Sequence, residues 1–304
     1  MKFKNILITG GAGYVGSSLT RKLVDMDNVE SIKIYDNLAN GRHVLLCGGM
    51  SSDKIEFIEA DILDNNSLKK ALVGVDTVIH LASVCSGGHH YMEQVNHWGT
   101  ANLINLMEDF EVKNFIFLSS AQVYGGGDKS FSVQDEPRPV TPYASSMLRA
   151  ERYVETLHKK CNTIIVRAAE IYGYSPVMAL DNRINKLIFD AKYDKIVHID
   201  GDGLAHKSAI HIDDLSKVLI NLLESKSDLT NLEARGCIYN VATEIFEEME
   251  IYNKLKSFIP DLEATFTSHH LRLPDLILDA SECSILEKID FNQAVKNILD
   301  STNF

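Results

Sequence analysis

The stretch "ITGGAGYVG" (Ile8–Gly16) decides the fold class of this chain, because three glycines follow directly after a short apolar run. Gly10, Gly13 and Gly16 have G-x-x-G-x-x-G spacing, and a helical pattern over about 14–26 comes next. The first glycine allows a tight turn, and the second lets the backbone approach a pyrophosphate. The third lets the helix pack closely against the strand, with the anion at the helix N-terminus. The stretch therefore predicts a dinucleotide-binding strand–loop–helix unit.

An acidic residue at the end of the second apolar run, "SIKIYD", indicates which dinucleotide binds. Asp36 stands 20 residues after Gly16. A carboxylate at this place accepts hydrogen bonds from ribose hydroxyls and repels a 2′-phosphate, so it favours NAD over NADP. Asp61 and Ile62 follow the next run and are expected near the adenine. The alternative is a tight strand–helix turn with ordinary surface and loop aspartates.

Short apolar runs alternate with helical patterns through the first half of the chain. Six of the runs indicate strands: "FKNILITG", "SIKIYD", "KIEFIEAD", "DTVIHLAS", "KNFIFLSS" and "NTIIVRAA". Such strands, separated by helices, are typical of a parallel sheet with helices on both faces. We predict an α/β fold with a Rossmann-type doubly wound parallel sheet over residues 1–170. The alternation is less regular over 171–304, which we expect to be mainly a smaller C-terminal substrate lobe with some segments returning to the Rossmann domain.

Composition and charge limit the possible partners. The 304 residues are 45% apolar and carry a net charge of −12, so we expect no nucleic acid, and an anionic ligand needs its own local Lys or Arg. No run approaches a membrane span or a signal peptide, which indicates a cytoplasmic protein without a membrane. No metal is expected, because the adjacent His89 and His90 do not share a helix face. Five scattered cysteines indicate reduced thiols: Cys47, Cys85, Cys161, Cys237 and Cys283.

A set of motifs makes the interpretation more specific than the glycines alone. In order, the chain contains "TGGAGYVG", "YDN", "ADI", "HLAS", "LSSAQVYG" and "YASSMLRAE", followed by "RAAEIYG", "GDGLAHKSAIHIDD" and "LRLPD". This series resembles the extended short-chain dehydrogenase/reductases that act on nucleotide sugars, which include UDP-galactose 4-epimerase and the sugar-nucleotide 4,6-dehydratases. The resemblance covers nearly the whole chain.

The resemblance implies roles for individual residues. Ser120 matches the family's donor to the reacting oxygen of the substrate, and Tyr143 matches the base that takes the sugar hydroxyl proton as hydride leaves to NAD. Asn96 matches a structural asparagine near the cofactor. Lys207 stands where an arginine usually holds the nucleotide, and Arg272 matches a diphosphate ligand.

Two contact sets are then expected. The cofactor contacts are Gly10, Gly13, Tyr14, Val15, Gly16, Asp36, Asn37, Asp61, Ile62, Leu81, Ala82, Ser83, Asn96, Ser119 and Tyr143. The substrate contacts are Val84, Ser120, Gln122, Glu170, Lys207 and Arg272. The family's usual dimer packs two helices per subunit, which here correspond to 91–110, carrying Trp98, and 144–160, so we expect a homodimer or a higher homo-oligomer.

The first departure from the family lies at the expected base. Met147 stands one helical turn after Tyr143, where the family has a lysine that lowers the tyrosine pKa and binds the nicotinamide ribose. An unperturbed tyrosine titrates near ~10, so little tyrosinate exists at neutral pH. Concerted proton removal needs no free tyrosinate. We therefore expect a slow or tightly cofactor-bound enzyme.

Two further departures narrow the activity. Ala121 and Gln122 occupy the positions of the acid pair that the family's dehydratases use, so 4,6-dehydration is not expected, nor is sugar-acid decarboxylation. Glu170 stands where the family usually has an asparagine near the substrate phosphate, and a carboxylate there repels a diphosphate.

These residues predict oxidation at C4 of a nucleotide-activated sugar, with a GDP-sugar favoured by the resemblance. Release of the keto sugar makes a 4-dehydrogenase, and reduction on its other face makes a 4-epimerase. A non-catalytic NAD-binding sensor or scaffold is the remaining alternative. Ser120 and Tyr143 favour the enzyme, whereas Met147 and Glu170 favour the sensor.

Overall fold

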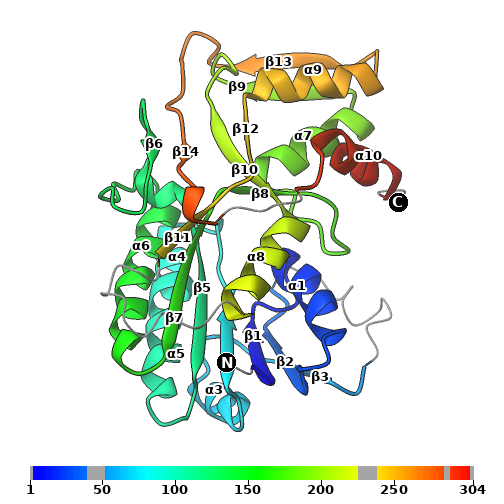
Figure 1. Cartoon of the computed structure of the whole chain (residues 1–304). Helices are drawn as coiled ribbons and strands as arrows, with labels where there is room; N and C mark the ends of the chain where they lie inside the picture. Colours follow the sequence, from blue (N-terminus) through cyan, green and yellow to red (C-terminus); the bar gives the residue numbers. More distant parts are fainter. Residues whose placement is uncertain (1–2, 40–51, 225–237, 284–287, 302–304) are drawn as a thin grey trace.

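A seven-stranded parallel sheet forms the centre of the molecule (Figure 1). The computed structural model describes residues 3–39, 52–224, 238–283 and 288–301. The strand order is β11-β7-β5-β4-β1-β2-β3, which confirms the predicted Rossmann-type doubly wound sheet. Its strands are β1 (Asn5–Thr9), β2 (Ser31–Asp36), β3 (Ile55–Glu59), β4 (Thr77–His80), β5 (Asn114–Ser120), β7 (Asn162–Ala168) and β11 (Ile238–Val241).

Helices cover both faces of this sheet, which explains why its central strands are continuous apolar runs. All four residues of β4 are buried. One face carries α1 (Tyr14–Val24) and α8 (Ile212–Glu224), which pack together (Figure 1). The other face carries α3 (Asn65–Leu72), α4 (His89–Met92), the π-helical turn η1 (Glu93–Gly99), α5 (Thr100–Met107) and α6 (Pro142–Val154), which continues into η3 (Glu155–Lys159).

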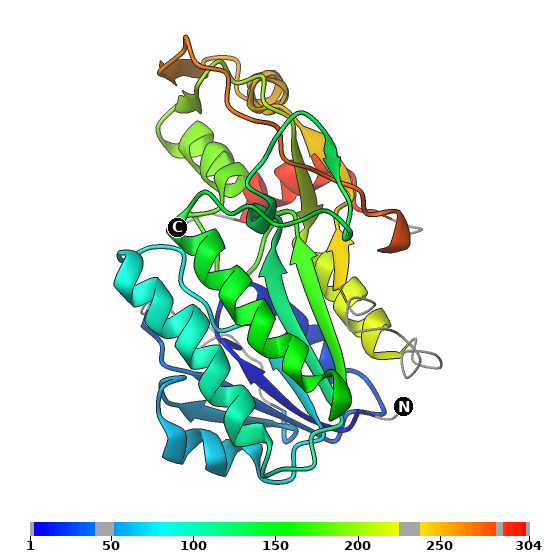
Figure 2. The same ribbon diagram turned by 90° about the vertical axis from the view of Figure 1, so that its left-hand side faces the viewer.

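The α5 and α6 helices lie side by side on one face of the molecule, as Figure 2 shows. They fall within the two segments expected to form a dimer. The Trp98 side chain on the preceding turn is 53% exposed, and its ring stacks on His97 at 4.7 Å between centroids. Dimerisation through this face stays a prediction.

A smaller lobe lies above the carboxyl ends of the sheet strands and has its own apolar core, which includes Tyr172, Phe246 and Phe291 (Figure 1). Its three sheets pair β8 (Glu170–Tyr172) and β12 (Glu244–Phe246) with β10 (Lys207–His211), β9 (Ile196–Asp200) with β13 (Glu263–Thr267), and β6 (Ser130–Phe131) with β14 (Ile277–Leu278). Its helices include α7 (Arg183–Tyr193), α9 (Glu248–Phe258) and α10 (Phe291–Ser301).

Among the described residues, Cys85, Cys161 and Cys283 are reduced thiols. The interpretation of Cys47 and Cys237 as reduced thiols falls outside the described residues.

A buried ion pair ties α6 to β7 beneath the smaller lobe. Glu151 and Arg167 are 2.7 Å apart, and their side chains are 1% and 4% exposed. Ser119 donates a hydrogen bond to Glu151 at 2.5 Å. Arg167 also donates to the Tyr124 hydroxyl at 2.9 Å, and Tyr124 donates to Asn240 at 2.8 Å. The network therefore joins β5, α6, β7 and β11 through buried side chains.

This network sets the position of the expected catalytic residues. Ser119 directly precedes Ser120 at the end of β5, and Glu151 lies two helical turns after Tyr143 on α6. Holding Ser119 against Glu151 therefore fixes the distance between the strand that carries Ser120 and the helix that carries Tyr143.

Removing one partner of the ion pair is predicted to destabilise the protein strongly. Arg167→Met leaves the Glu151 carboxylate buried without its charge partner, which costs about 3–5 kcal/mol of unfolding free energy. Glu151→Gln is expected to have a similar effect, and the double variant should lose less than the sum of the two. Urea denaturation measures all three. Additive losses under about 1 kcal/mol each would contradict a coupled buried pair.

Candidate active site

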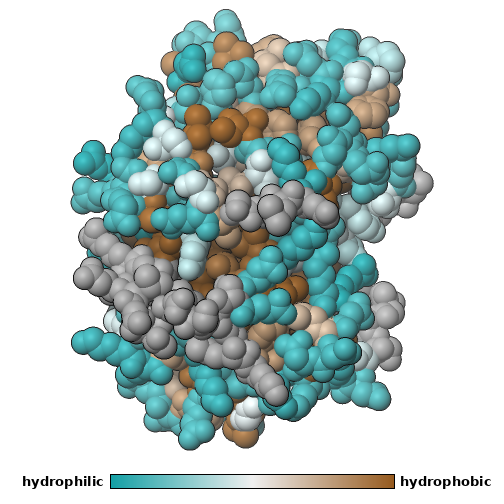
Figure 3. Space-filling view, viewed as in Figure 1, coloured by the Kyte–Doolittle hydropathy of each residue, from teal (hydrophilic) through white to brown (hydrophobic). Residues whose placement is uncertain are grey.

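A cavity of about 600 Å³ lies above the carboxyl ends of the central strands, between the large sheet and the smaller lobe. Figure 3 shows apolar surface in the hollow between the two parts of the molecule. The strand order reverses between β1 and β4, and ligands of doubly wound sheets bind at such a switch point. Most of the predicted site residues line this cavity: Gly10, Gly13, Tyr14, Val15, Gly16, Asp36, Asn37, Ile62, Leu81, Ala82, Ser83, Val84, Ser119, Ser120, Gln122, Tyr143, Glu170 and Lys207.

The glycine loop lies so close to its neighbours that side chains do not fit. Gly10 has a φ of +69°, and a Cβ on it would lie 2.6 Å from the backbone nitrogen of Ala82 at the exit of β4. A Cβ on Gly16 would lie 2.6 Å from the Gly10 carbonyl oxygen. These contacts give the first and third glycines the tight-turn and close-packing roles that the spacing predicted.

The start of α1 fits the pyrophosphate of a dinucleotide. The N-cap residue is Gly13, no side chain caps the helix, and its first turn has no acidic residue. Its first N–H groups and the positive end of the helix dipole therefore face the cavity without a competing carboxylate. Asp36, at the end of β2, lines the same cavity, where it accepts hydrogen bonds from Ala12 N at 3.1 Å and Leu38 N at 2.9 Å. The residues therefore fit NAD, and the position of Asp36 at the ribose stays a prediction.

Tyr14 joins the glycine loop to the smaller lobe. Its hydroxyl donates to the Gly173 carbonyl oxygen at 2.6 Å and accepts from the Asn185 side chain at 3.1 Å. Ser17 and Ser175 add a hydroxyl contact at 2.9 Å. Burial raises the pKa of Tyr14 well above its usual range, so this hydroxyl stays a donor. The lobe is thus bonded directly to the helix that begins the cofactor site.

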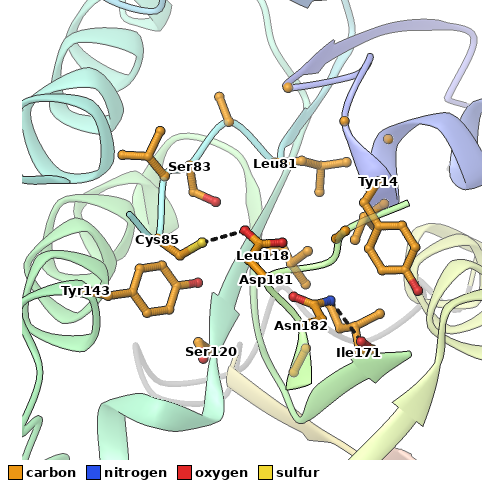
Figure 4. Close-up of a pocket in the computed structure, with 18 of the residues that line it drawn as sticks. Tyr14, Leu81, Ser83, Cys85, Leu118, Ser120, Tyr143, Ile171, Asp181 and Asn182 are labelled. Carbon is orange, nitrogen blue, oxygen red and sulfur yellow. Dashed lines mark hydrogen bonds between the residues drawn. The ribbon is translucent and has the colours of Figure 1, made fainter. Parts of the chain in front are cut away.

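The two expected catalytic residues come from different elements and meet in the cavity. Ser120 ends β5, whereas Tyr143 is the second residue of α6, whose first turn is capped by Thr141. Figure 4 shows the Tyr143 hydroxyl pointing into the cavity, with Ser120 on one side and Cys85 on the other. Ser120 lies close enough to Tyr143 to lower the pKa of the Tyr143 hydroxyl. A sugar hydroxyl placed between them can therefore contact both.

The surroundings of Tyr143 hold its proton on. Burial raises the pKa of Tyr143 above its usual range, and the nearby Cys85, Glu170 and Asp181 raise it further, against the opposing hydrogen bond from Ser120. The Cys85 thiol donates to the Asp181 carboxylate at 2.8 Å. The cavity thus presents an acidic wall to Tyr143.

Met147 does not supply a polar group to the cavity. Its side chain is 1% exposed and packs within the main apolar core. It lies one helical turn after Tyr143, outside the residues that line the cavity. The structure therefore places a buried thioether where the resemblance implies a lysine.

Asn96 supports the cavity wall by hydrogen-bonding the backbone of Val84. Its amide oxygen accepts from Val84 N, and its amide nitrogen donates to the Val84 carbonyl, both at 2.8 Å. The same nitrogen donates to Ser146 on α6 at 2.9 Å. Asn96 thus fixes the segment that follows β4 against α6, without lining the cavity itself.

Besides Met147 and Asn96, two more predicted site residues lie outside the cavity lining. Asp61 accepts from the Asn37 side chain at 2.8 Å and from Leu63 N at 2.9 Å, so it supports a residue that does line the cavity. The Arg272 side chain is 60% exposed and lies 3.9 Å from Asp275.

Residues near the start of α7 line the cavity although no motif marked them: Asp181, Asn182 and Arg183. Their positions depend on the packing of the smaller lobe, whereas Cys85 reaches the site from the segment that follows β4. A helix-start pattern at Asn182 was the available signal, but it indicates a helix and not a site.

Within the described residues, no group of His, Cys, Asp and Glu is arranged to hold a metal ion. None of the described helices is long and apolar enough to span a membrane.

Comparisons with known proteins give the same fold. The family model described as "NAD dependent epimerase/dehydratase family" matches residues 6–242. Human dTDP-D-glucose 4,6-dehydratase is 26% identical over 284 residues, which span 86% of this chain and 75% of that protein. UDP-glucose 4-epimerase of Bacillus subtilis is 26% identical over 278 residues, spanning 82% of this chain and 81% of that protein.

Two solved structures are similar along nearly their whole length. UDP-glucuronic acid 4-epimerase from Bacillus cereus, in complex with UDP-glucuronic acid and NAD, has a TM-score of 0.87 and 24% identity and covers 97% of this chain and 98% of that one. dTDP-glucose 4,6-dehydratase from Bacillus anthracis, in complex with NAD, has a TM-score of 0.83 and 19% identity and covers 98% of this chain and 96% of that one. At this identity the likeness concerns the fold.

The family model spans most of the chain, including the glycine loop, Asp36 and both residues that meet in the cavity. The chain belongs to the NAD dependent epimerase/dehydratase family.

Proposed function

We propose that this protein oxidises C4 of a nucleotide-activated sugar, GDP-D-glycero-α-D-manno-heptose, to the 4-keto sugar for surface or capsular polysaccharide biosynthesis. The observation that supports C4 oxidation is that Ser120 and Tyr143 lie in the same cavity, which the glycine loop borders. The motif set with Met147 in place of the lysine resembles the GDP-heptose 4-dehydrogenases of capsule biosynthesis, which supports the choice of sugar and nucleotide.

The chemistry assigned to the chain is a proton transfer at the C4 oxygen. The Ser120 hydroxyl donates a hydrogen bond to that oxygen and orients it toward Tyr143. Tyr143 accepts the hydroxyl proton as the C4–H bond breaks. NAD bound along the glycine loop supplies the hydride acceptor. Because the pKa of Tyr143 is raised, only a small fraction of the protein carries the tyrosinate that can accept this proton, which predicts slow turnover that increases with pH.

The residues next to Ser120 argue against loss of water. Ala121 and Gln122 form the turn η2 (Ala121–Tyr124) and line the cavity, where an acid and a base are needed to eliminate water from C5 and C6. Neither side chain can donate and accept a proton in this way. The proposal therefore excludes dehydration although 4,6-dehydratases are among the relatives.

A 4-epimerase is the second candidate, favoured by the similarity to UDP-glucose 4-epimerases. The product distinguishes the two candidates. The purified protein is incubated with NAD and GDP-D-glycero-α-D-manno-heptose. The sugar nucleotide is then analysed by mass spectrometry for its mass and by proton NMR for the configuration at C4. Loss of two hydrogens supports the dehydrogenase. Unchanged mass with inverted C4 supports the epimerase, loss of water contradicts both, and no reaction favours a non-catalytic NAD-binding protein.

Replacing Tyr143 with phenylalanine is predicted to stop turnover while NAD remains bound. The variant loses the proton acceptor but keeps the ring that forms the cavity wall, so kcat should fall by about 10²–10⁴-fold. Steady-state kinetics and titration of NAD measure the two effects. Ser146→Ala, on the same helix but bonded to Asn96, is the control and should retain more of the activity. Unchanged kcat in Tyr143→Phe would contradict the assigned base.

Restoring a lysine at position 147 is predicted to move the pH dependence. An ammonium one turn from Tyr143 stabilises the tyrosinate, so the rise of kcat with pH should shift down by about 1–3 pH units. Met147→Leu is the matched control, because it keeps the apolar packing and should leave the profile in place. Thermal unfolding of both variants shows whether the buried ammonium is tolerated. A folded Met147→Lys variant with an unshifted profile would contradict the proton-transfer scheme.

A further inference from the structure

The two cations in the cavity lining are already held by a carboxylate of the smaller lobe. Among the residues that line the cavity, Lys and Arg are represented by Lys207 and Arg183. Arg183 contacts the Glu248 carboxylate at 2.6 Å and 3.0 Å, and Lys207 lies 3.4 Å from it. The Glu248 side chain is 7% exposed. An anionic substrate that reaches this end of the cavity therefore meets cations that are partly neutralised.

Glu170 lines the cavity beside these cations and hydrogen-bonds the first turn of α7. Its carboxylate accepts a hydrogen bond from Arg183 N at 2.6 Å. The N-cap residue Asn182 does not cap α7, because its side chain donates to the Ile171 carbonyl oxygen at 2.8 Å (Figure 4). Glu170 thus takes the place of a cap, which holds its carboxylate at the cavity wall and prevents it from turning away into solvent.

Five titratable or charged groups face Glu170, each from a different segment. Their two positive charges do not neutralise both the Glu170 carboxylate and a bound diphosphate. They are Lys207 on β10, Arg183 on α7, Asp181 before α7, Tyr143 on α6 and Tyr14 on α1. Burial raises the pKa of the Glu170 carboxyl; Asp181 adds to this, and the Arg183 N–H and the charges of Lys207 and Arg183 oppose it. A doubly charged diphosphate beside Lys207 adds negative charge that favours the protonated acid.

We infer that Glu170 is a specificity-determining residue that takes up a proton when the diphosphate of a nucleotide sugar binds beside Lys207. This inference rests on the proposed function. As a neutral acid, Glu170 keeps a carbonyl oxygen for Arg183 N and gains an O–H that can donate to a phosphate oxygen. Repulsion is thereby replaced by a hydrogen bond. Affinity for the sugar nucleotide therefore increases as pH falls, because binding and protonation are linked.

Isothermal titration calorimetry on the NAD-loaded Tyr143→Phe protein tests the inference, because this background stops turnover and removes the tyrosine as a proton acceptor. GDP-mannose is the ligand, and UDP-glucose is the second ligand; their diphosphate diesters do not titrate near neutral pH. Buffers with different ionisation enthalpies report the proton count. We expect uptake of up to about one proton per bound ligand, and a Kd that rises by up to about tenfold per pH unit above neutral.

Glu170→Gln in the same background is the decisive variant. Glutamine keeps an acceptor for Arg183 N and offers a donor at every pH, so proton uptake should vanish and the Kd should become independent of pH. Asp200→Asn is the control, because it removes a carboxylate of the cavity lining that is not among the groups facing Glu170, so the proton uptake should stay in place. Thermal unfolding checks both variants.

The outcomes separate this inference from the proposed function. Binding of either sugar nucleotide without proton uptake and with a flat Kd overturns the inference alone, even if Glu170→Gln cannot be produced. Proton uptake that persists in Glu170→Gln, or disappears in Asp200→Asn, also overturns it. If neither of these sugar nucleotides nor GDP-D-glycero-α-D-manno-heptose binds at any pH, the proposed function fails and the inference fails with it.

Discussion

The close contact between the glycine loop and the exit of β4 is the constraint on which the site depends. At Gly10 the backbone adopts a φ of +69° and leaves no room for a Cβ against Ala82. The N–H of Gly10 donates to the Tyr35 carbonyl oxygen at 2.8 Å, so the loop is held between β2 and β4. This arrangement opens the start of α1 toward the cavity and places Tyr14 where it can bond the smaller lobe. One tight turn thus sets both the cofactor groove and the position of the lobe above it.

Acidic side chains outnumber basic ones around Tyr143, where the proposed chemistry takes place. Tyr143 faces Cys85, Asp181 and Glu170, while a buried thioether stands one turn along its helix. A bound cofactor and a bound diphosphate each change the charge of this region. Proton position and ligand binding are therefore expected to be coupled in this region.

The sequence predicted those features that depend on local pattern. The doubly wound sheet followed from six apolar runs, and the glycine spacing located the loop that the structure places at the switch point. The family resemblance also predicted that Ser120 and Tyr143 act on the same substrate oxygen, although 22 residues lie between them in the sequence. The structure adds that both residues lie in one cavity.

Other features could not be predicted, because they depend on packing between distant segments. Asp181 and Arg183 reach the cavity only through the docking of α7, and Glu248 neutralises Lys207 from α9. The positions of Asp61 and Arg272 outside the cavity lining likewise depend on loop geometry that short motifs do not specify.

Transfer of the C4 hydrogen to the cofactor is the central claim, and one labelling measurement tests it most directly. The purified protein is loaded with NAD, mixed with GDP-heptose that carries deuterium at C4, and quenched by denaturation. The molecular masses of the released cofactor and sugar are then determined by mass spectrometry. The account predicts deuterated NADH and a 4-keto sugar in the wild-type protein, and neither in Tyr143→Phe. Bound NAD without any deuterium, in a protein that binds the sugar nucleotide, would contradict the account.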